Sequence, residues 1–309
     1  MARWWIRIPI IKGERRNYAL HMAPEHEDLL AQHQVKVCNS ELIRKGKDFY
    51  IHITVKKPVS QALKTSNRVL AVDIGERNIA TSVVLVDGLI RKPRFHARSV
   101  RGLRRHYAWL RRILQERQHF RTLARIKSTE GRRIDDLLHK ASKAIIDHAV
   151  QENAIIAIGD LKGLRTSCPK GKRRRGKRFA RIVHNMPYHR LTTYIQYKAA
   201  WEGIPVILVG EEYSSRECHV CNNEGKRPSQ GLFICRACGW TGHADINGAA
   251  NIGKRAWSYM LQVGAPGSEP EGGQPDFSRD RPICSLERPS KRKDEESLET
   301  WGKRCLLLS

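Results

Sequence analysis

Four cysteines near residue 220 have the spacing of a metal site. They come as two C-x-x-C pairs, Cys218 with Cys221 and Cys235 with Cys238. Each pair can present two thiolates on one side of a tight turn, and four thiolates complete the tetrahedral shell of Zn²⁺. Because every ligand is protein sulfur, the shell leaves no position for a substrate water. We therefore expect structural zinc. The alternative is a pair of redox dithiols, but neither pair has the usual setting at the start of a helix.

Two aspartates occupy positions where a carboxylate is costly or held in place. Asp73 lies inside the apolar stretch VLAVDIG, and Asp245 follows the cysteines in HADINGAANI. A carboxylate in an apolar strand is unfavourable unless it is paired or binds a metal. Acids that converge from separate elements can hold two Mg²⁺ ions, which activate a water and stabilise the leaving oxygen in phosphodiester cleavage. The alternative is a cap or a surface acid, and Asp245 could be the N-cap of its own helix.

The elements that must position these residues follow from the hydrophobic patterning. Residues 1–58 are β-rich, and residues 59–68 have the composition of a linker. Beyond the linker we expect strands and helices in the following order: a β-hairpin over 69–90, one or two basic amphipathic helices within 91–133, a helix over 135–152, a buried strand at 154–158, a helix over 187–203, a strand at 206–210 and a helix over 243–258.

The charge of the chain indicates a polyanionic partner. Its 309 residues include 57 Lys and Arg against 31 Asp and Glu, a formal net charge of +26. Nucleic acid is the simplest partner for such an excess. The chain contains no run of 18 apolar residues, so no membrane span is predicted, and the start lacks the features of a signal peptide. The paired cysteines of a chain that lacks such a signal indicate a reducing compartment.

The order of the motifs resembles the TnpB (OrfB) proteins of insertion-sequence transposons, relatives of the type V CRISPR effector nucleases. The resemblance covers residues 1–257 and rests on VLAVDIGERNIATSVV, AIIAIGDLKGL and SSRECHVC…FICRACGW…HADINGAANI. It implies an α/β (α+β) protein: an RNase H-like RuvC domain with an inserted zinc ribbon, preceded by a β-barrel-like wedge domain. It also implies partners, a guide RNA from the transposon end and the target DNA, and Mg²⁺-dependent cleavage by an Asp-Glu-Asp triad. A protein of this family is expected in the prokaryotic cytoplasm, in association with the nucleoid. Asp73 matches the first acid of that triad and Asp245 the third.

The middle acid departs from the family pattern. Gly159 stands where the family has glutamate, and Asp160 matches the neighbouring acid, which is not catalytic. Successive strand residues point to opposite faces, so we expect Asp160 to point away from the metals unless a slip or a bulge turns it inward. Our hypothesis is that cleavage is lost or severely weakened. The alternative is an active endonuclease that uses Asp73, Asp160 and Asp245.

The beginning of the chain is a second departure. Family members usually carry a first wedge strand and a helical recognition lobe before the segment that resembles this chain from Trp4 and Trp5 onward. A natural minimal form, a shortened reading frame and a decayed remnant are all compatible with the sequence. The expected domains are a partial wedge domain at 1–58, a linker at 59–68, the first part of the RuvC-like domain at 69–213, the zinc ribbon at 214–242, the last RuvC-like helix at 243–258 and a disordered tail at 259–309.

Two basic segments should supply phosphate contacts, which add to affinity without specifying sequence. The residues that we expect to bind nucleic acid are Arg104, Arg105, Arg111, Arg112, Lys172, Arg173, Arg174, Arg175, Lys177, Arg178 and Arg216. Arg216 resembles a family position close to the nuclease cleft, although an ordinary surface arginine is equally compatible. His106 and Trp109 could stack on bases, whereas we expect Tyr107 and Phe120 to pack in the core.

Three functions fit these features. The chain is an RNA-guided endonuclease, a nucleic-acid-binding protein that acts by occupancy as a repressor does, or a transposon remnant. Strand transfer is not expected, because the sequence lacks the paired His and Tyr site of a tyrosine transposase. The sequence gives no indication of oligomeric state.

Overall fold

The computed structural model describes residues 4–59, 67–161, 187–210, 214–263 and 301–307. The chain divides into two compact units. The first comprises Met1–Ser60 with Phe277–Ser309, and the second comprises Gln61–Asp276. None of the described helices combines the length and the apolar character needed to cross a lipid bilayer.

The first unit is mainly β-structure, as the sequence predicts for residues 1–58. Strands β1 and β2 form an antiparallel hairpin, and β4 pairs antiparallel with β3 on one side and β13 on the other. Alternate residues of β4, namely Ile51, Ile53 and Val55, are buried. A short helix, α1, was not predicted. The elements are β1 (Trp4–Ile11), β2 (Glu14–Leu20), α1 (Pro24–Ala31), β3 (Lys36–Lys45), β4 (Asp48–Pro58) and β13 (Trp301–Leu307).

The second unit is built on a five-stranded mixed sheet in the order β7-β6-β5-β8-β9. Strands β7, β6 and β5 are antiparallel neighbours, whereas β5, β8 and β9 run parallel. The coarse prediction of a mixed α/β protein is therefore confirmed. The elements are β5 (Arg68–Asp73), β6 (Ala80–Val86), β7 (Leu89–His96), α2 (Ser99–Glu116), α3 (Phe120–Glu152), β8 (Ile155–Asp160), α5 (Tyr188–Trp201), β9 (Val206–Gly210), β10 (Lys226–Ser229), β11 (Leu232–Ile234), β12 (Thr241–His243) and α6 (Ala244–Val263).

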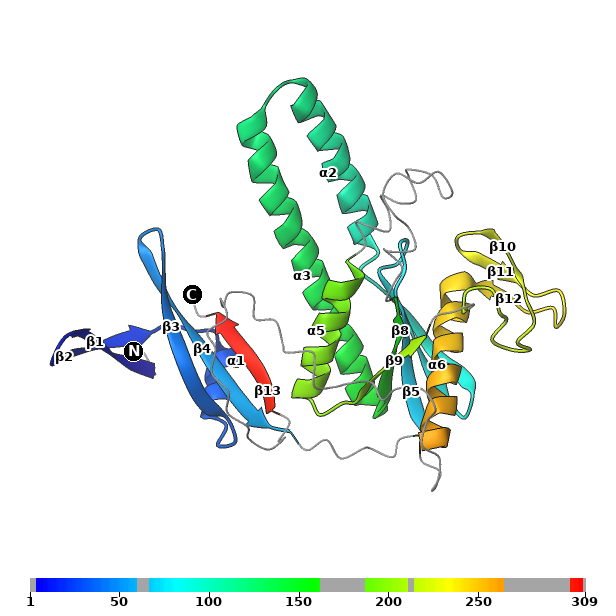
Figure 1. Cartoon of the computed structure of the whole chain (residues 1–309), viewed down its shortest axis with the longest axis horizontal. Helices are drawn as coiled ribbons and strands as arrows, with labels where there is room; N and C mark the ends of the chain where they lie inside the picture. Colours follow the sequence, from blue (N-terminus) through cyan, green and yellow to red (C-terminus); the bar gives the residue numbers. More distant parts are fainter. Residues whose placement is uncertain (1–3, 60–66, 162–186, 211–213, 264–300, 308–309) are drawn as a thin grey trace, which may run out of the picture. The chain divides into compact units, whose positions relative to one another are not determined.

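Helices cover both faces of this sheet (Figure 1). On one face, Val72 and Ile158 pack with residues of α3 and α5 in the larger core cluster. On the other face, Ala71 and Ala157 pack with residues of α6. Burial on both sides explains why β5 and β8 are nearly continuous apolar runs. The alternation of side chains along β5 and β8 therefore decides which residues can face α6.

The helical region differs from the prediction in where it breaks. Strand β7 occupies residues that we expected to be helical, and α2 ends at Glu116. Gln118, in the turn that follows, has a positive φ of 57°. Helix α3 then continues unbroken past residue 134, where we expected a separate helix to begin. Its continuity follows from the apolar residues at three- and four-residue steps in its second half. Figure 1 shows α2 and α3 as a helical hairpin.

The predicted disordered tail at 259–309 needs correction at both ends. Helix α6 continues to Val263 instead of ending at residue 258. The segment Trp301–Leu307 forms β13 and pairs with β4, from Trp301 opposite Pro58 to Leu307 opposite His52. A free edge of β4 offers unpaired backbone groups, and pairing with β13 satisfies them. Residues 264–300 lie outside the described part of the chain.

Candidate metal centre and acidic pocket

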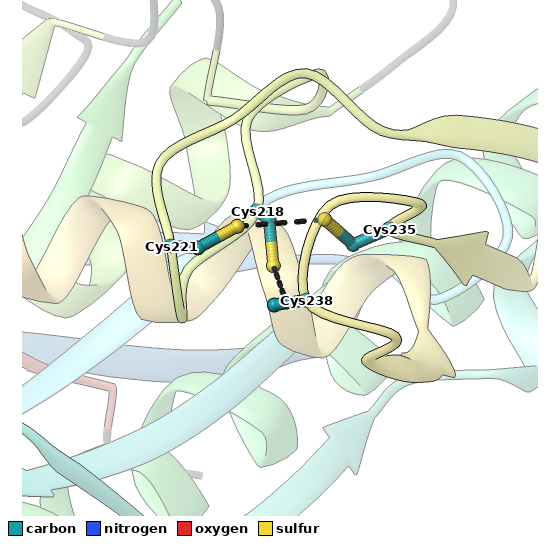
Figure 2. A group of neighbouring side chains, drawn as sticks. All are labelled: Cys218, Cys221, Cys235 and Cys238. Atoms are coloured by element: carbon teal, nitrogen blue, oxygen red, sulfur yellow. Dashed lines mark hydrogen bonds between the residues drawn. The ribbon is translucent and has the colours of Figure 1, made fainter.

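The four predicted cysteine ligands converge. Their sulfur atoms all lie within 4.8 Å of one another (Figure 2). The Sγ atoms of Cys218 and Cys238 are 3.7 Å apart, and those of Cys221 and Cys235 are 3.5 Å apart. A Zn–S bond of about 2.3 Å sets neighbouring sulfurs about 3.8 Å apart in a tetrahedron. The cluster could therefore hold a metal such as zinc with little movement, as the spacing predicts.

Two tight turns present these thiols. The amide of Asn222 donates to the Cys218 carbonyl at 2.8 Å, and the amide of Cys235 donates to the Trp240 carbonyl at 2.8 Å. The amide of Val220 also donates to the Cys218 sulfur at 3.4 Å. Hydrogen bonds from Asn223 lower the pKa of the Cys221 thiol to about 6. A thiolate is the form that binds metal, so this turn favours it at Cys221, whereas at Cys238 burial and the three other thiols outweigh a backbone hydrogen bond from Trp240 and raise the pKa to about 12.

Helix α6 fastens the first cysteine turn to the sheet domain. Asn251 donates through Nδ2 to the carbonyls of Ser214 and Glu217, each at 2.8 Å. Asn247 donates to the Glu217 carbonyl at 2.7 Å and accepts from the His219 amide at 2.9 Å. Both asparagines are buried. Since α6 also carries Asp245, the cysteine module and the acidic pocket share one rigid element.

The acidic pocket has a volume of about 240 Å³ and contains both predicted aspartates. Asp73 is the last residue of β5, and Asp245 is the second residue of α6. Helix α6 comes close to Asp73 because Gly248 has no side chain, and an added Cβ there would lie 2.9 Å from Asp73 Oδ2. The pocket is lined by Asp73, Ile74, Gly75, Glu76, Arg77, Ser214, Ser215, Arg227, Gln230, Ala244, Asp245 and Gly248.

Asp245 is held by partners from outside its own helix. Asn78, in the turn between β5 and β6, donates through Nδ2 to Asp245 Oδ2 at 2.8 Å. The Asp245 amide donates to His243 Nδ1 at 3.2 Å, and Arg227 Nη2 lies 3.6 Å from Asp245 Oδ1. The carboxylate therefore reaches across to the sheet, which makes the N-cap alternative unnecessary.

Asp73 carries an electrostatic penalty. Burial, with the negative charge of Asp245 as the second cause, raises its pKa to about 7, and Arg227 partly offsets the shift. Two nearby carboxylates without a cation cannot both ionise freely. A divalent cation would remove that penalty, so the electrostatics of this pair suit a cation site.

Gly159 lies on the same sheet face as Asp73. Val72 pairs with Ile158 in the parallel register of β5 and β8, and both pack on the α3 side. One residue further along each strand, Asp73 and Gly159 lie on the α6 side, while Asp160 follows Ile158 on the α3 side. Apart from the cysteines, no three His, Cys, Asp or Glu ligand atoms of the described residues lie within 4.8 Å of one another.

The arginine beside the aspartates was not the one predicted. Arg216 is exposed and does not line the pocket, whereas Arg227 does. Arg227 comes from β10, between the two cysteine pairs. Its backbone position depends on how the module folds back over the β5–β6 turn, so the sequence held no signal that singled it out. Arg77, in that turn, is a second arginine in the lining.

The predicted nucleic-acid-binding arginines of α2 separate into two sets. Arg104 and Arg111 are half-buried, and Arg111 forms an ion pair with Glu130 of α3. Arg105 and Arg112 are exposed. The half-buried pair faces the neighbouring helix, and the exposed pair is available to a partner. The remaining predicted residues, Lys172, Arg173, Arg174, Arg175, Lys177 and Arg178, lie outside the described part of the chain.

The aromatic residues of the hairpin also separate. Tyr107 is buried at 5% exposure, as predicted, while Phe120 is 65% exposed and not in the core as expected. Phe120 is the first residue of α3, at the turn of the hairpin, where no opposite helix surface covers it.

Comparison with known proteins adds a second line of evidence. Residues 188–252 match the model of the Cas12f1-like TNB domain. A TnpB-like protein of Methanocaldococcus jannaschii is 27% identical over 67% of this chain and 74% of its own length. InsQ of Escherichia coli (strain K12), provisionally named an RNA-guided DNA endonuclease, is 29% identical over 71% of this chain and 58% of its own.

The CRISPR-associated endodeoxyribonuclease Cas12f1 of Sulfoacidibacillus thermotolerans is 37% identical over 38% of this chain and 26% of its own length. The chain thus matches about three quarters of one relative but only about a quarter of another. The match to the TNB domain spans α5, the cysteine cluster and the first part of α6. The chain is therefore similar to TnpB-like proteins along about two thirds of its length.

Proposed function

We propose that this chain binds nucleic acid as an RNA-guided endonuclease does, with Mg²⁺-dependent cleavage weakened or lost. Its partners are a guide RNA from the transposon end and the DNA that pairs with it. One observation carries the proposal. Asp73 shares its sheet face with Gly159, a residue that has no carboxylate, while Asp160 follows Ile158 on the opposite face.

We propose in addition which domains the two units form. The sheet of the second unit with α6 is an RNase H-like RuvC domain, residues 214–242 are its zinc ribbon, and residues 1–58 are a partial wedge domain. Support comes from the mixed sheet, from the acid at the end of its central strand β5, and from the four converging thiols.

Asp73 and Asp245 would hold Mg²⁺, a hard cation that prefers oxygen ligands. When bound, such an ion supplies an activated water and stabilises the leaving oxygen of a phosphodiester. The chain's own residues do the rest. Asn78 and His243 orient Asp245. Arg227 neutralises the carboxylates, and its guanidinium can contact a phosphate oxygen that enters the pocket. Two carboxylates carry less charge than three, which weakens the hold on the cation.

The alternative active form, with Asp160 as the middle acid, has less support. Asp160 would have to reach the pocket from the far face of the sheet, and it is absent from the pocket lining. The register of β8 with β9 is regular from Ile156 to Asp160, without the bulge that such a reversal needs.

Binding and cleavage measured side by side test the proposal. The protein, reconstituted with its transposon-end RNA, is mixed with a supercoiled plasmid that carries the matching target. We expect retarded mobility of the plasmid and little or no nicking in Mg²⁺. Efficient nicking that disappears in Asp160→Asn would contradict the proposal and support the alternative. Nicking that survives Asp73→Ala would indicate a contaminating nuclease.

Sequencing of copurified RNA tests the guided part separately. A discrete RNA that ends in a variable segment is the expected result after expression with the flanking locus. Only degraded bulk RNA that moderate salt releases would reject guided binding and would favour a remnant with an unselective basic surface.

A further inference from the structure

One face of α2, extended by its N-cap residue Arg98, carries a line of cationic and aromatic side chains, most of which are exposed. Arg98, Arg101, Arg105, Trp109 and Arg112 follow one another at steps of three or four residues. At about 100° per residue they lie within an arc of roughly 80°. We call these five residues the α2 arginine stripe. Arg98, Arg105, Trp109 and Arg112 are exposed, and Arg101 is partly exposed.

The stripe begins at the acidic pocket. Arg101 Nε lies 3.0 Å from Glu76 Oε1, and Glu76 lines the pocket. The Arg98 guanidinium carbon lies 5.3 Å from the centroid of the Phe95 ring. The centroids of the Phe95 and His243 rings are 4.7 Å apart, and His243 lies two residues before Asp245. From there the stripe runs along α2 for about 21 Å, roughly six nucleotides at their 3.4 Å spacing in a stacked strand.

Trp109 is the unusual member of the stripe. Its side chain is 52% exposed, although the opposite face of α2 buries Val100 and Tyr107 against the core. The Trp109 ring lies 6.0 Å from the ring of His106, with an angle of 33° between their planes. A single exposed aromatic residue is ordinary. An exposed indole with an arginine four residues before it and another three residues after it offers a flat ring between phosphate-binding groups.

Of the two ion pairs of the stripe, that of Arg101 with Glu76 is partly buried and fixes the stripe to the pocket, whereas that of Arg112 is exposed. Arg112 Nε lies 3.6 Å from Glu116 Oε1, and both side chains are largely exposed. Such an exposed pair contributes little and opens easily. Arg104 and Arg111, by contrast, point toward α3, where Glu130 pairs with Arg111. The helix therefore has one set of arginines that serves the fold and another that faces outward.

We propose that the α2 arginine stripe is a track for single-stranded DNA that leads into the acidic pocket, with Trp109 as a base-stacking platform. The arginines match the charge of a phosphate backbone, and the indole needs an unpaired base face, which a strand offers and a duplex interior does not. The choice of DNA rests on the proposed function, in which the acidic pocket is the site of a DNA endonuclease whose cleavage is weakened or lost.

Photocrosslinking and binding in EDTA test the track without metal, guide RNA or cleavage. The probe is a ten-nucleotide oligothymidylate with one 5-iodouracil, used with the full chain. Peptide mapping should find the crosslink on residues 105–112. Trp109→Ala should weaken binding about tenfold with an unchanged salt slope, and Trp109→Phe should recover most of the affinity. Arg105→Ala should reduce the slope of log affinity against log salt by about 0.7, one phosphate contact on a single strand.

Phe120→Ala is the matched control, because Phe120 is also largely exposed on the same hairpin but lies off the stripe; we expect less than a twofold change. A change of less than twofold in Trp109→Ala, or a crosslink confined to other parts of the chain, would overturn the track. An equal loss on a ten-base-pair duplex would overturn stacking by an unpaired base. A larger loss on oligouridylate RNA than on DNA would overturn the choice of DNA. Because cleavage is not measured, an inactive nuclease site would leave these outcomes unaffected.

Discussion

The cysteine cluster and the acidic pocket are two metal-type sites that share helix α6 but differ in how complete they are. The cluster draws four thiols from a stretch of about twenty residues, and their spacing already fits a tetrahedral ion. The pocket brings together Asp73 and Asp245, which lie far apart in the sequence, and Gly159 contributes no ligand. A local site depends on one turn geometry, whereas a distributed site can lose one ligand and leave the fold intact. Under the proposed function, the cysteine cluster keeps all four of its ligands while the acidic pocket lacks one carboxylate.

The complete site should respond most strongly to the loss of one ligand. Cys235 is 1% exposed, so Cys235→Ser would leave a buried three-thiol site. Structural zinc contributes about 10–16 kcal/mol in zinc-finger peptides, so we expect bound zinc to fall to near zero. Elemental analysis and hydrogen exchange of residues 214–243 check this result. Cys38→Ser, outside the cluster, should retain one zinc per chain. Retention of zinc in Cys235→Ser would show that three thiols suffice.

The acidic pocket should respond in the opposite direction. Removing the Asp73 carboxylate should raise stability, because it removes a buried charge that lies near Asp245. Asp73 has a pKa raised to about 7 from 3.8, so the folded state binds more protons than the unfolded state between these values. The protonated Asp73 carboxyl therefore contributes to the free energy of unfolding below pH 4, and this contribution is lost as the pH rises through 7. Asp73→Asn should therefore stabilise the protein at pH 8 by on the order of 4 kcal/mol, and by less than half of that at pH 5.

Urea unfolding at the two pH values measures this difference. Asp136→Asn is the control, because Asp136 forms an exposed pair with Lys140 and should change stability by less than about 0.5 kcal/mol. Equal effects of Asp73→Asn at pH 5 and pH 8 would contradict a strained carboxylate pair.

The element that joins the two sites should show an intermediate effect. Asn251 is 4% exposed and donates to two carbonyls of the first cysteine turn. Asn251→Ala leaves both carbonyls without that donor, at a cost of about 1–3 kcal/mol. Chelator competition should show weaker zinc retention as well as a lower urea midpoint. Ser128→Ala, which removes an exposed 2.9 Å bond to the Arg125 carbonyl in α3, away from the cluster, should have the smaller effect. Equal effects would mean that α6 does not support the cluster.

Helix α2 also carries arginines of two kinds: some pair with the neighbouring helix, and others are exposed to solvent. Arg111→Ala breaks a partly buried pair with Glu130 and should destabilise the chain by about 1 kcal/mol. Arg112→Ala breaks an exposed pair with Glu116 and should change stability by less than about 0.5 kcal/mol. Thermal unfolding of the two variants side by side checks the order, and the reverse order would contradict the assignment of their roles.

Local patterns made much of this architecture predictable. The C-x-x-C spacing located the cluster, the acid within an apolar run identified Asp73, and strand alternation put Gly159 and Asp160 on opposite faces. The position of Arg227 could not be predicted, because it depends on how the cysteine module folds over the β5–β6 turn. The turn after α2 could not be predicted either, since residues 117–119 include neither Gly nor Pro. Strand β13 needs a pairing partner more than 200 residues away, which no local pattern encodes.

Restoring the missing ligand tests the central claim most directly. Gly159→Glu puts a carboxylate on the sheet face that Asp73 shares, while the matched variant Asp160→Glu changes the opposite face. With the transposon-end RNA and a target plasmid, Gly159→Glu should gain Mg²⁺-dependent nicking that Asp73→Ala abolishes, and Asp160→Glu should not. If Gly159→Glu folds and binds zinc but nicks no faster than the natural chain, the missing carboxylate is not what limits cleavage.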